Sequence, residues 1–149
     1  MVRGISMLVT TGTKPPRKEN KVERVKRERD GLDCLDPLMD YARTGFASIT
    51  EDDRDVRLRW YGLYTQRPEE EGYFMLRLKI PNGSLTCDQL ESLGNLSVRY
   101  AQNTGDITTR QDIQFHFVRI EDVPEIFAEL KRIGLSSSGA CGDITRNIT

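Results

Sequence analysis

The sequence is poor in cysteine and histidine and has no long apolar run. Its three cysteines, Cys34, Cys87 and Cys141, lie far apart with no C-x-x-C pair, which argues against a disulfide framework and against a metal site built within this chain alone. No stretch approaches the roughly 20 apolar residues of a membrane-spanning helix, and the amino end lacks the apolar run of a secretory signal. A Walker loop, a Gly-rich dinucleotide turn and a nucleophilic triad are also missing. We therefore expect a cytoplasmic protein that makes no membrane contact.

Basic and acidic side chains are nearly balanced over the whole chain, since the formal net charge is -1. This balance gives no global electrostatic argument for a nucleic-acid partner. The distribution is uneven, because residues 1–30 hold nine basic and four acidic side chains, whereas residues 31–149 hold thirteen and nineteen. A chain of 149 residues forms one domain of ordinary size and needs no disulfide to fold.

The first third of the chain is predicted to be a leader followed by helices. Residues 1–20 lack periodicity and favour disorder. The segment Lys21–Arg29 is helix-prone with a thin apolar stripe, so it is either a helix docked on the protein or a solvated charged helix. A further helix is predicted to start at Asp36-Pro37 and to end near Gly45.

Strict alternation from Gly72 onward predicts a strand with one core face. The apolar positions are Phe74, Leu76, Leu78 and Ile80, and the other face ends in the cations Arg77 and Lys79. Thr86-x-x-Gln89 resembles a capping box. It opens a helix whose predicted apolar positions are Leu90, Leu93, Leu96 and Tyr100.

A second strand and a second long helix follow. Ile113, Phe115 and Phe117 are predicted on the core face, and Arg110, Asp112, Gln114 and His116 on the other. Asp122-x-x-Glu125 predicts a capped helix that ends at Gly134. The order strand, helix, strand, helix indicates an α+β fold of the ferredoxin-like, split-βαβ type, with the helices on one sheet face and a helical arm before it.

The face opposite the helices is predicted to be cationic. It would carry Arg77, Lys79, Arg110, Gln114 and His116, with Arg146 nearby if the tail folds back. Guanidinium groups on such a face suit a polycarboxylate or a small oxyanion. An ordinary solvated sheet face has the same alternation, a lone histidine is more often structural than a ligand, and the cysteines can be simple buried thiols. Spacing alone leaves these alternatives open.

Five blocks of sequence, in this order along the chain, carry a more specific signal: KVERVKRERDGLD, LRWYGLYTQR, YFMLRLKIPNG, TTRQDIQFHFV and ACGDITRNIT. From Lys21 to Thr149 the chain resembles the amino-terminal arm and first ferredoxin-like half-domain of the siroheme-containing nitrite and sulfite reductases of the ferredoxin-dependent type. The predicted leader at 1–20 lies outside the resemblance, which implies a helical arm at 21–66, the half-domain at 67–136, and the start of the siroheme/[4Fe-4S] domain at 137–149.

The resemblance also implies an activity and a set of residues. Members of this family reduce nitrite to ammonia or sulfite to sulfide by six electrons, at a siroheme coupled to a [4Fe-4S] cluster, with ferredoxin as donor. Arg77 and Arg146 would bind the substrate anion. The siroheme contacts would be Thr108, Thr109, Arg110, Gln114, His116 and Arg146. Tyr64 and Cys141 would form a thioether cross-link beside the site, or remain an ordinary tyrosine and a buried thiol.

The chain also departs from the family pattern. A complete enzyme continues into cysteine motifs that ligate the cluster, and none of the three cysteines here matches one, although a [4Fe-4S] cluster needs four thiolates. We expect an amino-terminal fragment from a truncated gene model or incomplete assembly, without a metal site and inactive alone, whose complete enzyme is a monomer acting on nitrite or sulfite. The alternative is a non-catalytic ferredoxin-like module that binds nucleic acid through its basic arm.

Overall fold

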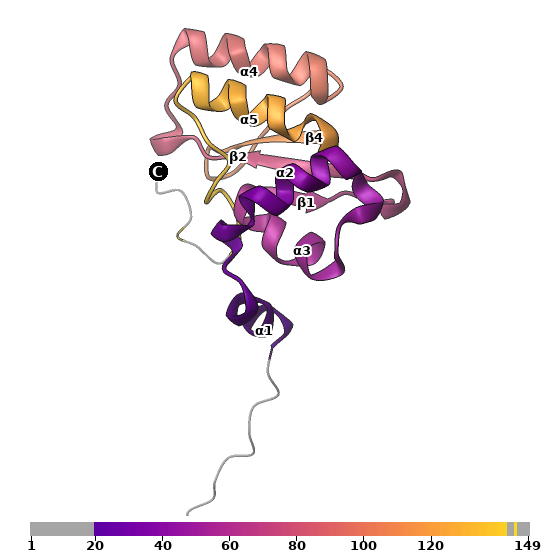
Figure 1. The fold of residues 1–149 in the computed structure, drawn as a ribbon. Helices are drawn as coiled ribbons and strands as arrows, with labels where there is room; N and C mark the ends of the chain where they lie inside the picture. Colours follow the sequence, from indigo (N-terminus) through magenta and orange to yellow (C-terminus); the bar gives the residue numbers. More distant parts are fainter. Residues whose placement is uncertain (1–19, 143–144, 146–149) are drawn as a thin grey trace, which may run out of the picture.

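A four-stranded antiparallel sheet forms the centre of the molecule. The computed structural model describes residues 20–142 and 145 (Figure 1). The sheet has the order β1-β2-β4-β3, and every neighbouring pair is antiparallel. Its strands are β1 (Leu63–Thr65), β2 (Tyr73–Leu78), β3 (Asp106–Ile107) and β4 (Ile113–Arg119). The predicted α+β class is confirmed, whereas the short strands β1 and β3 were not predicted.

Helices α4 (Cys87–Tyr100) and α5 (Val123–Arg132) cover one face of this sheet. The helices α1 (Lys21–Glu28), α2 (Leu35–Thr44) and α3 (Glu51–Asp55) precede the first strand. In Figure 1, α4 and α5 lie side by side above the sheet, and α2 packs beside α5. The alternate residues of β2 that were predicted for the core are buried there: Phe74, Leu76 and Leu78 are fully buried, in one apolar cluster with Leu93, Leu96, Ile126 and Leu130.

The starts of α4 and α5 differ from one another. At α4 the capping box is complete, because the Thr86 hydroxyl accepts from the Gln89 amide at 3.2 Å and the Gln89 side chain accepts from the Thr86 amide at 3.0 Å. At α5 the predicted capping box is wrong. The 3-10 turn Ile120–Asp122 runs directly into the helix, so Asp122 already has helical backbone angles and its side chain caps nothing. Leu90, predicted for the core face of α4, is 59% exposed.

A β-bulge in β4 changes which residues face the helices. Leu76 pairs with Phe115 and Phe74 pairs with Val118, so His116 and Phe117 together stand opposite Met75. Phe117 has a φ of 63°, and its ring packs edge-on against Tyr73 at 5.8 Å. The prediction of Phe117 on the core face is therefore wrong, since Val118 takes that place and is fully buried.

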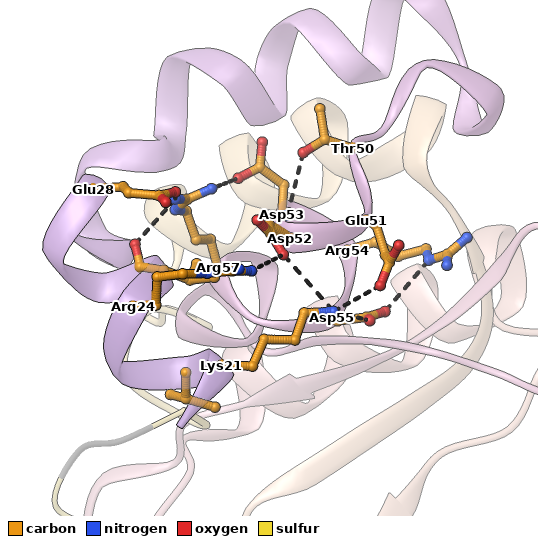
Figure 2. Close-up of polar contacts among 12 residues, drawn as sticks. Lys21, Arg24, Glu28, Thr50, Glu51, Asp52, Asp53, Arg54, Asp55 and Arg57 are labelled. Atoms are coloured by element: carbon orange, nitrogen blue, oxygen red, sulfur yellow. Dashed lines mark hydrogen bonds and ion pairs between the residues drawn. The ribbon is translucent and has the colours of Figure 1, made fainter. Parts of the chain in front are cut away.

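A buried ion pair within the helical arm holds α1 in place (Figure 2). Arg57 Nη1 donates to Asp53 Oδ1 at 2.7 Å, and Arg57 Nη2 donates to the carbonyl oxygen of Val25 in α1 at 3.0 Å. Val25 itself is fully buried, so α1 is docked rather than solvated. Among the described residues, no helix is both long and apolar enough to cross a bilayer.

Candidate functional site

The face of the sheet away from α4 and α5 carries a hollow of about 330 Å³. It lies where β1 and β2 meet the loop between β3 and β4. Its lining consists of Tyr64, Met75, Arg77, Thr108, Thr109, Arg110 and Asp112. Three segments of chain that are distant in sequence thus contribute to one concave surface, and five of the predicted site residues line it.

Arg77 is the cation at the base of this hollow. Alternation along β2 places it on the face opposite Leu76 and Leu78. Its register partner on β4 is Gln114. With the Gln114 amide oxygen turned toward the guanidinium, that oxygen accepts from Arg77 Nε at 3.0 Å and from Nη2 at 2.5 Å. No carboxylate among residues 20–142 forms an ion pair with Arg77.

The loop Thr108–Asp112 forms the opposite wall. The Thr108 hydroxyl accepts from the amides of Arg110 at 3.3 Å and Asp112 at 3.0 Å, an arrangement that fixes a tight turn. Asp112 is buried, and its Oδ1 accepts from the Ile80 amide at 3.1 Å. The prediction that Arg110 and Asp112 lie on the polar face of a strand is wrong, because the chain turns at these positions before β4 begins.

Tyr64 lies between two guanidinium groups and a thiol. Arg59 Cζ is 5.2 Å and Arg77 Cζ is 6.0 Å from the centroid of its ring. Its hydroxyl is hydrogen-bonded to the thiol of Cys141, and burial together with this hydrogen bond raises the pKa of Tyr64, against the opposing charge of Arg77. Sequence analysis missed Arg59, which lies in the 3-10 turn Arg57–Tyr61, where no periodicity marks a face.

The remaining predicted residues are placed around the hollow or lie beyond the described chain. His116, at the bulge, has its Nδ1 3.3 Å from Gln66 Oε1 and its Nε2 3.2 Å from Asp106 Oδ2. Lys79 follows β2, with its amide bonded to the Ser136 carbonyl at 2.9 Å. Arg146 lies outside the described residues. The hollow thus unites Arg77, Thr108, Thr109 and Arg110, with Gln114 and His116 on the adjacent strand.

The described part of the chain holds no group of three or more His, Cys, Asp or Glu residues that could bind a metal ion. Cys34 and Cys141 are buried, as predicted for ordinary thiols, but Cys87 is exposed, and none of the three forms a disulfide. The donors at the hollow are instead guanidinium and hydroxyl groups. Such a set is suited to oxyanions and carboxylates and not to a cation.

Comparison with known proteins bears on this site. The family "Nitrite/Sulfite reductase ferredoxin-like half domain" matches residues 66–133. A ferredoxin–nitrite reductase of Leptolyngbya laminosa is 45% identical over 131 residues, covering 87% of this chain and 26% of that protein. A ferredoxin sulfite reductase of Mycobacterium tuberculosis (strain CDC 1551 / Oshkosh) is 37% identical over 143 residues, 85% of this chain and 26% of that protein.

A solved structure gives the same result for the fold. The structure of Mycobacterium tuberculosis NirA protein superposes with a TM-score of 0.82 at 36% identity, covering 86% of this chain and 26% of that one. The chain therefore spans about a quarter of the length of the relatives that it matches, and the similarity lies in their amino-terminal part.

Proposed function

Because the chain contains a nitrite/sulfite reductase ferredoxin-like half domain, we propose that it supplies the first quarter of an enzyme that reduces nitrite to ammonia or sulfite to sulfide by six electrons. The observation that carries this proposal is the hollow, in which Arg77, Arg110 and two threonine hydroxyls converge. The proposed donor is ferredoxin, for which the similar reductases are named. We also propose the predicted division into a leader, arm, half-domain and start of a cofactor domain, at 1–20, 21–66, 67–136 and 137–149.

The residues at the hollow fit part of a siroheme site. Siroheme is rich in carboxylates, and the donor set on this face consists of guanidinium, hydroxyl and amide groups, which bind carboxylates well. Siroheme, when bound, supplies the iron at which the substrate is reduced. In this proposal the siroheme contacts are Thr108, Thr109, Arg110, Gln114 and His116, with Arg146 as a further one.

Arg77 binds the substrate anion in this scheme. Gln114 and Tyr64 hold its guanidinium in place, so the positive charge lowers the cost of bringing an anion to a cofactor that is itself negatively charged. It also stabilises the charge that develops as oxygen leaves nitrogen or sulfur. Arg146 is proposed as the second cation. Removing one such preorganised donor typically costs about 10²–10³ in kcat.

The chain does not fit a [4Fe-4S] cluster. Four thiolates are required, and the chain has three cysteines. Cys34 packs in the core beside α2, Cys87 is exposed at the start of α4, and Cys141 contacts Tyr64. We therefore propose that the cluster ligands lie outside this chain, and we expect the chain alone to be inactive as a reductase.

Tyr64 and Cys141 are proposed to form a thioether in the complete enzyme. The Tyr64 hydroxyl and the Cys141 thiol interact, so a bond from the sulfur to the ring carbon beside the hydroxyl would join two groups that are already neighbours. Replacing one aromatic C–H and the S–H by a C–S bond releases two electrons and two protons, which dioxygen can accept as hydrogen peroxide. Peptide mapping of the complete enzyme tests this, because recovery of only unmodified Tyr64 and Cys141 peptides contradicts it.

The structure gives no support to the alternative that the basic arm binds nucleic acid. Lys21 Nζ lies 2.8 Å from Glu51 Oε1 and 2.9 Å from Asp55 Oδ2 (Figure 2). Arg24 pairs with Asp52 at 3.7 Å. These basic groups of the arm are directed at carboxylates of α3, so we do not propose nucleic acid as a second function.

The test uses the full-length gene, recovered by sequencing past codon 149 and expressed with a supply of siroheme. The variants are Arg77→Ala and, as a matched control, Arg43→Ala on the exposed surface of α2, where Arg43 pairs with Asp40. We expect siroheme absorption bands in all proteins, with turnover of nitrite or sulfite lost only in Arg77→Ala. Equal turnover by Arg77→Ala and Arg43→Ala, or a full-length protein without siroheme bands, overturns the proposal.

A further inference from the structure

Trp60 packs against the backbone of two segments that are distant in sequence. It is the one tryptophan in the chain, lies in the 3-10 turn Arg57–Tyr61 and is 6% exposed. A β-carbon added to Gly31, which opens the turn before α2, would lie 2.5 Å from Trp60 Cγ and Cε3. A β-carbon added to Gly142, at the other end of the described chain, would lie 3.2 Å from Trp60 Cδ2. Both backbones therefore lie directly against the indole ring.

The segment 136–142, which follows α5, is also held by its backbone. The carbonyl oxygen of Trp60 accepts from the Gly139 amide at 2.9 Å. At the start of the segment, the Lys79 amide after β2 donates to the Ser136 carbonyl oxygen at 2.9 Å. This segment forms no helix and only a single β-bridge. Its course is therefore set by these few contacts, of which Trp60 supplies two.

Cys141 lies in this segment, next to the candidate site. It is fully buried, and Ala140 before it is 4% exposed. The Cys141 thiol interacts with the Tyr64 hydroxyl. Tyr64 is fixed to the same turn by the chain itself, because only Gly62 separates the turn from β1. The turn thus positions Tyr64 through the backbone and Cys141 through the contacts of Trp60.

From this geometry we propose that Trp60 is a positioning residue for the Tyr64–Cys141 pair, and that Gly31 sets the place of its indole. A large aromatic ring with only two side-chain torsions is well suited to hold neighbouring backbone at a fixed distance. A side chain at Gly31 would have to displace this buried ring. The displacement would be transmitted to Gly142 and so to Cys141. Gly31 therefore affects the hollow without lining it.

The chemical use of this arrangement rests on the proposed function. A thioether forms only if the Cys141 sulfur stays beside the Tyr64 ring, and fixing two reacting groups in place makes such a step effectively unimolecular. Trp60 contributes through the backbone of Gly139 and Gly142. It takes no part in the bonds that form or break.

The experiment measures the accessibility of the three thiols in the 149-residue chain. N-ethylmaleimide is added to the native protein for a series of times, and the labelled fraction of each cysteine is determined from peptide masses. Cys87 is exposed, whereas Cys34 and Cys141 are buried. Cys87 therefore reports on the reagent, and Cys34 reports on general loosening of the core. In the wild type we expect rapid labelling at Cys87 alone.

Substitution of Trp60 tests its positioning role directly. Trp60→Leu keeps an apolar side chain but removes the ring that lies against Gly142. We expect Cys141 to be labelled roughly tenfold faster or more, because local opening of its segment then requires less free energy. Cys34 should keep its protection. Trp60→Phe retains an aromatic ring and should restore most of the protection of Cys141, a rescue that separates positioning from a general effect on stability.

A second variant leaves Trp60 in the chain. Gly31→Ala should also accelerate the labelling of Cys141, whereas the matched control Gly94→Ala, with nothing within 4 Å of the added methyl group, should not. Unchanged labelling of Cys141 in Trp60→Leu overturns the inference. Equal acceleration of Cys34 and Cys141 in both Trp60→Leu and Gly31→Ala also overturns it. Unchanged labelling of Cys141 in Gly31→Ala contradicts the role of Gly31.

The result is distinguishable from that of the reductase test. Labelling uses the chain without siroheme, so absence of siroheme from the full-length protein overturns the proposed function and leaves the positioning of Cys141 intact. In the complete enzyme, Trp60→Leu should lower the fraction of Tyr64 and Cys141 peptides that are cross-linked. A wild-type enzyme without any cross-link contradicts the proposed thioether, whereas the labelling rates still decide the role of Trp60.

Discussion

Replacing Asp53 by asparagine should destabilise the protein strongly, although Asp53 does not line the hollow. Asp53 is 4% exposed and Arg57 is 7% exposed. Asp53 accepts from Arg57 Nη1 at 2.7 Å and from the Tyr41 hydroxyl at 2.5 Å. Asp53→Asn leaves the Arg57 guanidinium buried without its main counter-charge, with only the half-exposed Glu28 at 3.2 Å. Breaking a buried pair from one side costs about 3–5 kcal/mol.

The neighbouring residue provides the control. Asp52 has a 32% exposed side chain and meets Lys21 and Arg24 at 3.8 and 3.7 Å. Asp52→Asn removes one negative charge from the same helix and should cost less than about 1 kcal/mol. Urea denaturation followed by the fluorescence of Trp60, the one tryptophan in the chain, gives both free energies of unfolding. Equal losses in the two variants would refute the argument from burial.

The pH dependence of the same pair has a definite sign. Burial alone would raise the pKa of Asp53, but hydrogen bonds from Tyr41, Arg57 and Thr50 outweigh it, and the pKa is lowered. A carboxyl with a lowered pKa in the folded state contributes stability above its unfolded pKa of about 3.9. This contribution is lost as the pH falls through the folded pKa. The acid limb of the stability curve should therefore be shallower in Asp53→Asn than in the wild type.

Four further substitutions test local features by the same denaturation assay. Gly62→Ala puts a methyl group 2.3 Å from the Arg77 carbonyl oxygen at a φ of 81° and should cost at least about 2 kcal/mol, whereas Gly94→Ala, with nothing within 4 Å, should gain about 0.5–1 kcal/mol. A gain in both would contradict the close approach of the Gly62 and Arg77 backbones. Thr86→Ala removes the capping box and should cost about 1 kcal/mol, with no loss if water replaces the hydroxyl fully. Gln102→Gly, at a φ of 52°, should stabilise by up to about 1 kcal/mol, and a loss would show that the Gln102 side chain matters more than its backbone.

Regular alternation made the central strands and long helices predictable. The apolar positions of β2 and the Thr86 capping box were evident because each depends on residues close in sequence. The bulge was not, because Phe117 is apolar and continues the alternation that an inserted residue interrupts. The burial of Asp112 could not be anticipated either, since its partner is a backbone amide at Ile80, at the end of another strand.

Within the candidate site, the residues in regular strands were predictable and those in turns and connections were not. Arg77 and Gln114 face the same side because each lies in a regular strand, and their pairing follows from register. Arg110 reaches the hollow from a turn. The period-two alternation of a strand does not apply there, so it cannot predict which way the Arg110 side chain points. Arg59 and Gln66 lie outside the regular strands, and their contacts with Tyr64 and His116 depend on how distant segments meet.

The bulge has a consequence for how the length of this chain can vary. Upstream of it the core-facing residues are Ile113 and Phe115, and downstream they are Val118 and Ile120. Deleting residue 116 or 117 would restore simple pairing and would leave Phe115 opposite Leu76 and Val118 opposite Phe74, so both halves of β4 would keep their faces. A single-residue deletion should therefore be accepted at the bulge and in the exposed connection at 102–104, but rejected in the regularly paired parts of β4 on either side of the bulge, where it would turn side chains to the opposite face. A deletion scan scored by soluble expression would map this boundary residue by residue.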